Sequence, residues 1–512
     1  MLVKVYAAAL QGINATIVTI EVNCNKGIKF FLVGLPDNAV REGHERIISA
    51  LRVNGYEFPR KQIVVNMAPA DTRKEGSAYD LPLAIGILAA AETISSEKLH
   101  QYMLMGELSL DGTLQPVKGV LPIAIKAREE GFKGIVIPKA NAREAAVVNN
   151  LDVYGVENIK EVLEFFNNER ELEQTIVNTR EEFFDNQRSF DFDFMDVKGQ
   201  ENVKRALEVA AAGGHNLIMI GPPGAGKSML AKRLPSILPP LTINEALETT
   251  KIHSVAGKVN KGVSLLSARP FRSPHHTISD AAMVGGGTFP QPGEISLAHN
   301  GVLFLDELPE FTRSVLEVMR QPLEDRKICI SRARFSVEYP ASFMLIASMN
   351  PCPCGFYNHP EKSCVCPPGA VQKYLNRISG PLLDRIDIQI EIVPVPFEKM
   401  SDTHVSESSS VVKERVVKAR GIQDERFKNL PEVYCNAQMS SRMLQKYAQP
   451  DAAGLQLLKN AMNRLNLSAR AYDRILKVSR TVADLDDSEN VLPLHIAEAI
   501  NYRNLDRDSW GG

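Results

Sequence analysis

Over residues 1–166, short apolar runs alternate with an apolar stretch of helical length. The runs Ile63 to Met67 and Gly134 to Pro138 are rich in β-branched residues, which is typical of strands. Leu81 to Ala91 is almost continuously apolar over a length that suits a helix. The pattern therefore predicts an α/β domain at 1–166.

Residues 194–396 show a second α/β pattern, in which uninterrupted apolar runs precede helical segments. A strand that is apolar at every position has both faces buried, as in a parallel sheet covered by helices. The runs of this kind are Leu217 to Ile220, Val302 to Leu305 and Phe343 to Ala347. After Pro394-Val-Pro396 the pattern becomes helical, so we expect a helical domain over 397–512.

The segment 167–193 between the two α/β regions is acidic and contains no glycine. These features predict a linker that is helical in part. Its phenylalanines indicate that it packs on a neighbouring domain, and they are Phe183, Phe184, Phe190 and Phe192.

The composition narrows the class of protein. Hydrophobic residues make up 44% and charged residues 23% of the 512 residues, which excludes disorder as the main state. No apolar run reaches the roughly 18–20 residues of a membrane span, and the start of the chain has no signal-peptide pattern. We therefore expect a cytoplasmic protein with no membrane contact. The net charge of −2 excludes a basic coat for nucleic acid but not a local basic patch.

A phosphate-binding loop follows the first buried run. Residues 221–228 match G-x-x-x-x-G-K-[ST] in full, between a strand and a helix. The glycines let backbone N–H groups turn toward phosphate oxygens, and the helix N-terminus adds partial positive charge. Lys227 is expected to reach the β- and γ-phosphates, and Ser228 to bind Mg²⁺. The predicted nucleotide-binding residues are Gly221, Pro222, Pro223, Gly224, Ala225, Gly226, Lys227 and Ser228.

Polar residues end the two later buried runs. Asp306 and Glu307 follow Val302 to Leu305, and parallel sheets bind ligands at that edge. We expect Asp306 to hold Mg²⁺ and Glu307 to act as the general base that polarises the attacking water. Asn350 ends the next run and is expected to orient that water.

These three motifs, in this order, resemble those of an AAA+ ATPase. Longer strings resemble the YifB/ComM family of magnesium-chelatase-like AAA+ ATPases. The strings are PGEISLAHNGVLFLDE (292–307), NPCPCG (350–355), SGPLLDRID (379–387), VGLPDNAVRE (33–42) and NMAPAD (66–71). The resemblance covers essentially the whole chain and implies ATP and Mg²⁺ as cofactors.

Two arginines take their roles from this resemblance. Arg385 resembles the arginine finger that reaches the γ-phosphate of a neighbouring protomer, which implies a homo-oligomeric, hexameric ring. Arg470 resembles sensor 2 on the helical lid, acting on its own or on a neighbour's nucleotide. The alternative for each is an ordinary surface salt bridge.

The N-terminal region resembles a Lon-protease-like domain with a ribosomal-S5-type α/β fold. Lon proteases use a Ser–Lys pair. Here the nucleophile position falls at or near Asp80 and the lysine position near Leu121, although Ser77 and Lys118 are close in sequence. A nucleophile needs an adjacent base, and none is evident at these positions. We therefore expect a domain without protease activity that docks on the ring or handles DNA.

A cysteine-rich loop spans residues 351–369. Cys352, Cys354, Cys364 and Cys366 form C-x-C…C-x-C, and four thiolates can close a tetrahedral Zn²⁺ site. His359 is a spare candidate ligand. Unliganded thiols and a redox role are the alternatives.

Three segments are candidates for contact with a substrate: 269–276, which contains His275 and His276, 284–290, and 326–334. Two adjacent histidines could suggest a metal site, but neighbours on a strand point to opposite faces. A loop or interface is therefore the preferred interpretation for them. The last segment reads as a pair of hairpin strands with four basic residues, similar to the pre-sensor-1 hairpin of MCM helicases. Basic side chains at a pore would contact phosphates. The alternative is a solvated charged hairpin.

Three functions are compatible with these features. The family resemblance implies a ring that moves on single-stranded or branched DNA, as a helicase or branch-migration motor in recombination or natural transformation, with recombination proteins as partners. A chelatase-type subunit that remodels a protein partner is the alternative. A regulatory module that only senses ATP is disfavoured, because it would need no lytic machinery.

Overall fold

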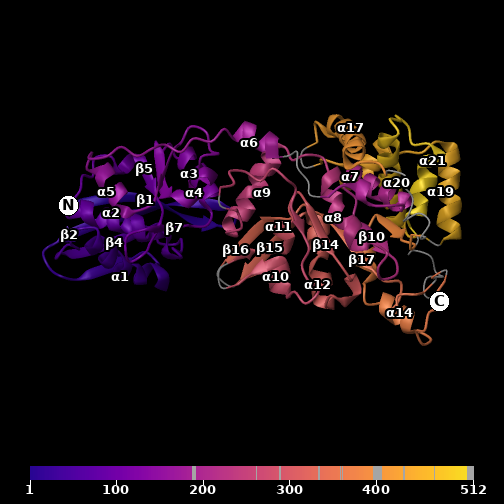
Figure 1. Ribbon diagram of the computed structural model, residues 1–512, viewed down its shortest axis with the longest axis horizontal. Coiled ribbons are helices and arrows are strands. Elements are labelled where there is room, and N and C mark those ends of the chain that lie inside the picture. Colours follow the sequence, from indigo (N-terminus) through magenta and orange to yellow (C-terminus); the bar gives the residue numbers. More distant parts are fainter. Residues whose placement is uncertain are drawn as a thin grey trace.

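Two α/β domains and a helical bundle follow one another along an elongated chain in the computed structural model (Figure 1). The structure describes residues 1–186, 192–260, 262–287, 290–332, 335–357, 359, 361–395, 406–430, 433–465 and 467–503. Among these residues, no helix combines the length and the apolar character that a bilayer crossing requires.

The N-terminal domain is a mixed sheet with the strand order β3-β4-β2-β1-β5-β8-β9. Its strands are β1 (Leu2–Gln11), β2 (Asn14–Asn25), β3 (Phe30–Val33), β4 (Gln62–Ala68), β5 (Tyr102–Leu104), β8 (Gly134–Pro138) and β9 (Asp152–Val156), with the separate pair β6 (Glu107–Leu108) and β7 (Leu114–Gln115). Its helices are α1 (Asn38–Val53), α2 (Asp80–Ala90), α3 (Val120–Glu129), α4 (Lys139–Ala145) and α5 (Ile159–Phe166). The pairs β1–β2 and β2–β4 are antiparallel, and the other neighbours are parallel.

Helix α2 is the centre of this domain, because every one of its residues is buried. It lies against β1 and β2, and Gly86 permits the close approach. A Cβ atom at Gly86 would come within 2.9 Å of the Val22 side chain. The expected strands at 63–67 and 134–138 and the expected helix from Leu81 are therefore confirmed.

The second domain is a parallel sheet with the order β11-β14-β17-β10-β18. These strands are β10 (Leu217–Ile220), β11 (Phe271–Arg272), β14 (Val302–Leu305), β17 (Met344–Met349) and β18 (Ile388–Glu391). The helices are α7 (Glu201–Gly213), α8 (Lys227–Ile237), α9 (Ile243–Val255), α10 (Asp280–Val284), α11 (Glu294–Leu297), α12 (Arg313–Val318), α13 (Arg320–Asp325), α14 (Ala370–Leu375) and α15 (Gly380–Leu383). Every residue of strands β10, β14 and β17 is buried, as their apolar runs predict.

Two antiparallel hairpins project from this domain, β12 (Gly285–Gly286) with β13 (Gln291–Pro292) and β15 (Lys327–Arg332) with β16 (Phe335–Pro340). The prediction that residues 326–334 form both strands of a hairpin is wrong. They supply β15 alone, because the pairing strand comes from the apolar-alternating residues that follow. Residues 288–289 of the first hairpin and 333–334 of the second, including Arg334, lie outside the described residues.

The C-terminal helices are α17 (Ser409–Phe427), α18 (Ser441–Tyr447), α19 (Ala452–Arg464), α20 (Ala469–Leu485) and α21 (Pro493–Asn501). Helices α17 and α20 pack on α7, so the bundle shares a hydrophobic core with the parallel sheet. A buried polar bridge crosses the same boundary. Asp387 accepts hydrogen bonds from His215 (3.2 Å) and from Arg474 of α20 (2.9 Å). Asp387 is the last residue of the family-like string 379–387. The proposed domain boundary at 396–397 lies outside the described residues.

The acidic linker contains α6 (Thr179–Asn186) and ties the two α/β domains together. Glu182 pairs with Arg143 of α4 at 2.5 Å and accepts a hydrogen bond from Ser264 at 2.9 Å. Phe183 is buried in the N-terminal core, and Arg233 of α8 lies over the ring of Phe192 at 5.4 Å. The linker therefore packs on its neighbours. Phe184 is half exposed, and Phe190 lies outside the described residues.

Helix α9 makes a second junction between these domains. It packs on α3, and the Ser254 hydroxyl donates to the buried carboxyl group of Glu144. The turn between β1 and β2 makes a third junction, because a Cβ at Gly12 would lie 2.9 Å from Val337 of β16. The N-terminal domain thus contacts both the helical face of the parallel sheet and the long β15–β16 hairpin of the second domain.

Phe183 and Phe184 test whether the linker is structural. Phe183→Ala removes a ring that is only 2% exposed, and we expect the N-terminal domain to lose about 3 kcal/mol of unfolding free energy. Phe184→Ala is the matched control, with an expected loss of about 1 kcal/mol or less because that ring is 50% exposed. Hydrogen–deuterium exchange of β8 and β9 in a denaturant series measures both. Equal losses would contradict the packing described.

Candidate functional site

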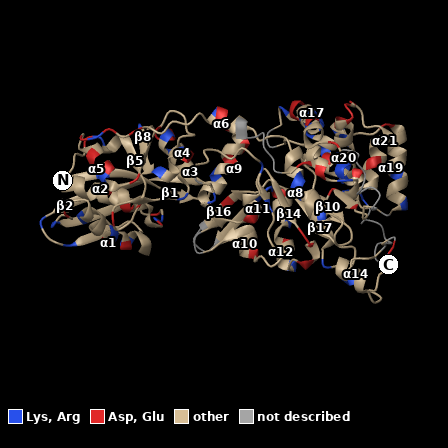
Figure 2. Cartoon of the chain, viewed as in Figure 1, with Lys and Arg blue, Asp and Glu red and all other residues tan. Residues whose placement is uncertain are grey.

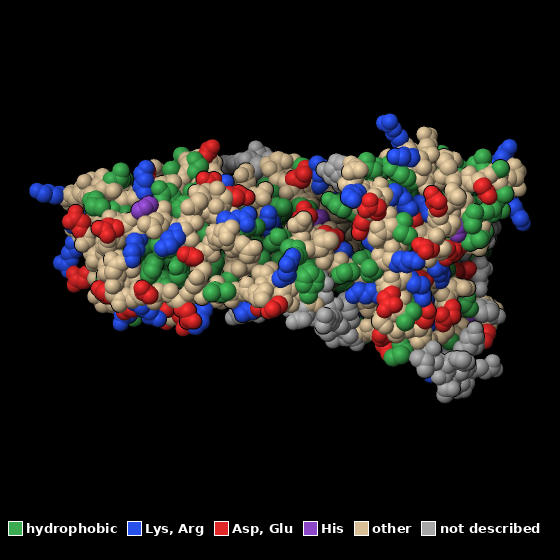
Figure 3. All heavy atoms as spheres, turned by 90° about the horizontal axis from the view of Figure 1, so that it is seen from above, with side chains coloured by type: hydrophobic (Ala, Val, Ile, Leu, Met, Phe, Trp, Pro, Cys, Tyr) green, Lys and Arg blue, Asp and Glu red, His purple; other side chains and the backbone are tan. Residues whose placement is uncertain are grey.

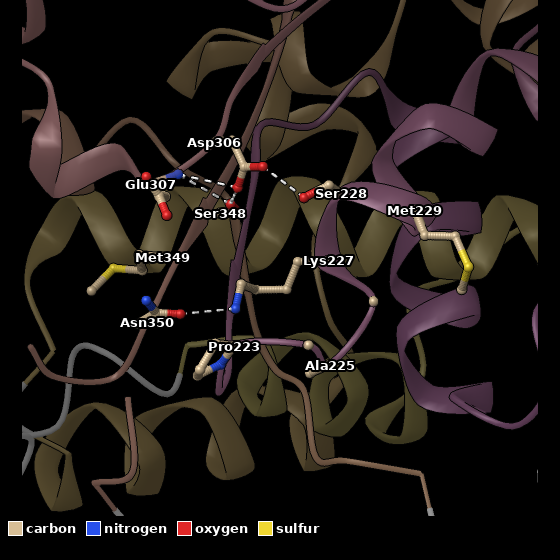
Figure 4. Close-up of a pocket in the computed structure, with 12 residues that line it drawn as sticks. Pro223, Ala225, Lys227, Ser228, Met229, Asp306, Glu307, Ser348, Met349 and Asn350 are labelled. Atoms are coloured by element: carbon tan, nitrogen blue, oxygen red, sulfur yellow. Dashed lines mark hydrogen bonds between the residues drawn. The ribbon is translucent and has the colours of Figure 1, made fainter. Parts of the chain in front are cut away.

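The candidate site lies at the C-terminal ends of β10, β14 and β17, which are neighbours in the sheet. Strand β17 lies between the other two, so Asn350 follows a strand tip between the phosphate loop and the acidic pair. A cavity of about 350 Å³ opens there (Figure 4). It is lined by Pro223, Gly224, Ala225, Gly226, Lys227, Ser228, Met229, Asp306, Glu307, Ser348, Met349 and Asn350. The structure thus brings most of the predicted site residues to one cavity.

Lys227 lies at the floor of this cavity and is 9% exposed. Its ammonium group donates hydrogen bonds to the carbonyl oxygens of Gly221 (2.7 Å) and Pro222 (2.9 Å) and to Asn350 Oδ1 (3.1 Å). Burial lowers the pKa of Lys227 below its ordinary value, and the nearby charges of Asp306 and Glu307 oppose that shift. All three hydrogen-bond acceptors are neutral, so an anionic phosphate would be a stronger partner for this cation.

Asp306 is oriented by three donors. Ser228 Oγ donates to Oδ2 at 2.6 Å, the Ser348 hydroxyl donates to Oδ1, and the Glu307 N–H donates to Oδ1 at 3.1 Å (Figure 4). The two groups predicted to hold Mg²⁺, the Ser228 hydroxyl and the Asp306 carboxylate, therefore already face each other. Oxygen donors of this kind are the ligands that Mg²⁺ prefers.

Glu307 has a left-handed backbone conformation, with φ of 54°. A non-glycine residue in this region costs free energy and is often found at functional sites. The turn leaves the Glu307 side chain 57% exposed, so its carboxylate is open to a water molecule.

Two residues near the acidic pair were not predicted from the sequence. Ser348 is the polar residue within β17, and side-chain alternation places it on the same face as Asn350. That alternation was the available signal. His276 lies with its Nδ1 atom 3.8 Å from Glu307 Oε2, and its ring lies 4.1 Å from that of His275. Both histidines follow β11 in a loop, as preferred, and their rings lie together rather than on opposite faces.

Arg385 and Arg470 lie outside the cavity. Arg385 donates to the carbonyl oxygen of Pro381 at 2.7 Å and pairs with Glu324 of α13, while its Nε atom is buried with no hydrogen-bond partner. Arg470 pairs with Asp384 at 2.9 Å and is 68% exposed. Asp384, the partner of Arg470, is adjacent to Arg385 in the sequence, so the two arginines lie in the same region of the domain, outside the cavity.

The four cysteines of the 351–369 loop come together. Cys352 Sγ lies 3.3 Å from Cys354 Sγ and 3.8 Å from Cys364 Sγ, and the last two are 3.5 Å apart. All four sulfur atoms, including that of Cys366, lie within 4.8 Å of one another. The spare ligand candidate His359 is not part of this group, because its Nδ1 atom accepts hydrogen bonds from the N–H groups of Glu361 and Lys362.

The Lon-like region contains no Ser–Lys pair at the positions considered. Asp80 is buried and bound by Arg46 through two hydrogen bonds of 2.7 and 3.0 Å. Leu121 is a core residue of α3, and the Ser77 hydroxyl donates to Glu107 rather than to an amine. Lys118 is exposed at the junction with α9, beside Gly257.

The phosphate-loop strand β10 is fourth of the five strands in the sheet. Strands β14 and β17 end in the acidic pair and in the asparagine, close to the phosphate loop. These features define the chain as an AAA+ ATPase. Three family matches agree: magnesium chelatase, subunit ChlI, over residues 193–400; subunit ChlI of Mg-chelatase over 20–141; and the magnesium chelatase, subunit ChlI, C-terminal family over 406–503.

The particular family follows from full-length relatives. The competence protein ComM of Haemophilus influenzae is 44% identical over 508 residues, which cover 98% of this chain and 97% of the relative. The uncharacterised protein YifB of Escherichia coli is 44% identical over 507 residues, with the same coverage of both chains. The chain therefore belongs to the YifB/ComM family of magnesium-chelatase-like AAA+ ATPases. Lon protease 2 of Bacillus subtilis is 31% identical over 163 residues, which cover 28% of this chain and 27% of that protein.

The lowered pKa of Lys227 predicts how ATP affinity depends on pH. Binding of phosphate favours the ammonium form, so above the pKa of the free protein each binding event must also take up a proton. Affinity for a non-hydrolysable ATP analogue should therefore fall as pH rises through a value below the ordinary 10.5 of lysine. Calorimetric titration across alkaline pH measures this. Lys227→Ala should bind weakly and lack this pH dependence, whereas unchanged wild-type affinity up to the ordinary pKa would contradict it.

Proposed function

We propose that the chain is a ring-forming ATPase that moves on single-stranded or branched DNA, as a helicase or branch-migration motor in recombination or natural transformation. The observation that carries the DNA part is the long β15–β16 hairpin, which leaves the ATPase domain between the acidic strand tip and β17. A hairpin in this position can respond to changes at both strand tips. The relative named competence protein points the same way, since competence is the uptake of DNA by bacteria.

The proposed chemistry begins with ATP in the β10–β14–β17 cavity. Lys227 holds the β- and γ-phosphates, and backbone N–H groups of residues 221–228 surround them. Ser228 and Asp306 would hold Mg²⁺, which supplies positive charge to the phosphate oxygens. Asn350 orients the attacking water, and Glu307 accepts its proton. His276 lies close enough to Glu307 to influence where that carboxylate points.

Arg385 and Arg470 complete the site from a neighbouring subunit in this proposal. Each guanidinium lies away from its own cavity, on the edge that carries Asp384 and Glu324. Their present partners are exposed or partly exposed carboxylates, and such pairs stabilise a protein little. Exchange of these carboxylate partners for a γ-phosphate would therefore cost little free energy. The same arrangement makes ATP turnover depend on assembly, which the family resemblance gives as a hexameric ring.

The hairpin would contact DNA through its phosphates. Lys327 pairs with Glu338 at 3.0 Å, and both side chains are about half exposed. A phosphate can replace that carboxylate. Basic and acidic residues are mixed along the chain and over the face seen from above, so a DNA-binding channel would arise by bringing several hairpins together in a ring (Figures 2 and 3).

ATP turnover with and without DNA tests this proposal. Single-stranded DNA and a four-way junction should stimulate turnover roughly threefold or more, and added salt should weaken the effect. Glu307→Gln should still bind ATP while turnover falls about 10²- to 10⁴-fold. Lys327→Gln should reduce stimulation and leave the basal rate unchanged.

The matched control is Lys418→Gln, because Lys418 is also an exposed lysine paired with a carboxylate, that of Asp487 at 2.9 Å. It should behave as wild type. ATPase activity that no DNA changes would contradict the DNA motor and favour a chelatase-type subunit that acts on a protein partner.

Mixing inactive variants tests whether Arg385 acts on a neighbour. Glu307→Gln subunits keep the arginine, and Arg385→Ala subunits keep the catalytic glutamate. In a random equal mixture, about one quarter of the interfaces combine an intact cavity with an intact neighbouring arginine. Activity should therefore reappear on mixing. Glu307→Gln mixed with Lys227→Ala should stay inactive because every cavity is defective. No recovery in the first mixture would contradict action between subunits.

A further inference from the structure

We propose that the four cysteines of the 351–369 loop bind one zinc ion, and that this ion holds the sensor asparagine and the phosphate loop in the positions that ATP hydrolysis requires. The functional part of the proposal rests on the ATPase activity of the chain and not on its action on DNA.

The sulfur positions fit a tetrahedral thiolate site. Zn–S bonds are about 2.3 Å long, which puts the sulfurs of a Cys₄ site about 3.8 Å apart. The separations of 3.3, 3.5 and 3.8 Å among the sulfurs of Cys352, Cys354 and Cys364 are equal to this value or up to 0.5 Å shorter, and they are far too long for a disulfide bond of about 2.05 Å. Among the described residues, these cysteines are the one group whose donor atoms converge in this way.

Backbone N–H groups surround the sulfur atoms. The N–H groups of Phe356 and Val365 lie near Cys354 Sγ, and the N–H group of Cys354 lies near Cys366 Sγ. Donors of this kind stabilise sulfur in its charged form, which is the form that binds metal. A loop that placed its cysteines only as small apolar residues would have no need to direct these donors at them.

The described part of the loop has little else to hold it. It forms no regular element between β17 and α14, and Val365 is 80% exposed, so apolar burial does not fix the Cys364–Cys366 segment. Ordering a loop of this length costs conformational entropy at every residue. Bonds to a metal ion can offset that cost.

The cluster is joined directly to the nucleotide cavity. Cys352 is fully buried and follows Asn350 by two residues, and Asn350 accepts the hydrogen bond from Lys227. The Cys352–Gly355 turn then lies on the phosphate loop, because a Cβ at Gly355 would come within 2.6 Å of Pro223 Cδ. An ion bound tetrahedrally by the cysteines would therefore fix two walls of the cavity, Asn350 and the phosphate loop. Small displacements of positioning groups lower catalytic rates strongly.

Metal content and ATP turnover of the full-length chain test the proposal together. Mass spectrometry of the purified protein should find one zinc per chain, and Co²⁺ in its place should give the intense visible bands of tetrahedral thiolate coordination. Cys364→Ser should lose the metal, and its ATP turnover should fall at least roughly tenfold. Cys364→His should keep both, since zinc accepts three cysteines and one histidine.

Cys329→Ser is the matched control, because Cys329 is an exposed thiol outside the cluster. It should keep its zinc and its activity. Circular dichroism checks that Cys364→Ser remains folded, and Cys354→Ser is a second variant if it does not. A metal-free protein with full turnover would overturn the zinc site. Zinc-free Cys364→Ser with full turnover would overturn the coupling to the cavity, and neither result depends on DNA.

Discussion

The nucleotide site depends on the hydrogen bonds made by the buried ammonium group of Lys227. Burial of a charge is costly, and here the hydrogen-bond partners are neutral oxygens of Gly221, Pro222 and Asn350, while the nearby charges of Asp306 and Glu307 also favour the ammonium form. These hydrogen bonds hold the phosphate loop closed on itself and tie it to the tip of β17. The site is thus arranged around a cation for which an anionic phosphate would be a stronger partner than these neutral oxygens. Because Lys227 also binds Asn350, the geometry of the cavity depends on the segments that hold Asn350 in place. The cysteine loop that follows Asn350 is one of them.

In the proposed function, a single chain holds only part of the catalytic machinery. The residues proposed as base, as Mg²⁺ ligands and as the water-orienting amide come from three adjacent strands, which a parallel sheet brings to one edge. The two arginines are on another edge, bound to carboxylates that are easily exchanged. If the proposed arrangement holds, this division makes assembly a condition for turnover. The proposed ring is also compatible with the net charge of −2, since DNA binding would depend on repeated hairpins rather than on overall charge.

The N-terminal domain is organised around a buried ion pair at the start of its central helix. Asp80, at or near which the nucleophile position was expected, has its carboxylate buried against Arg46 and starts the central helix α2. A buried ion pair of this kind ties α1 to α2. The domain instead packs on α9 through Glu144 and Ser254 and touches β16 through the β1–β2 turn. Its contacts place it where it can brace the ATPase domain and the hairpin.

The sequence by itself determined the local chemistry. Continuous apolar runs predicted β10, β14 and β17 because strands buried on both faces have no polar alternation, and the residues after each run predicted the nucleotide site. The tertiary structure decided what depends on distant segments. Residues 326–334 looked like a whole hairpin, but β15 pairs with residues beyond it. His276 reaches Glu307, and Asp387 pairs with Arg474, through folding that no local pattern reveals. Likewise, the spacing of the cysteines allowed a metal site, but only the folded loop brings their sulfur atoms together against the phosphate loop, because side-chain separations across a loop are set by packing and not by sequence distance.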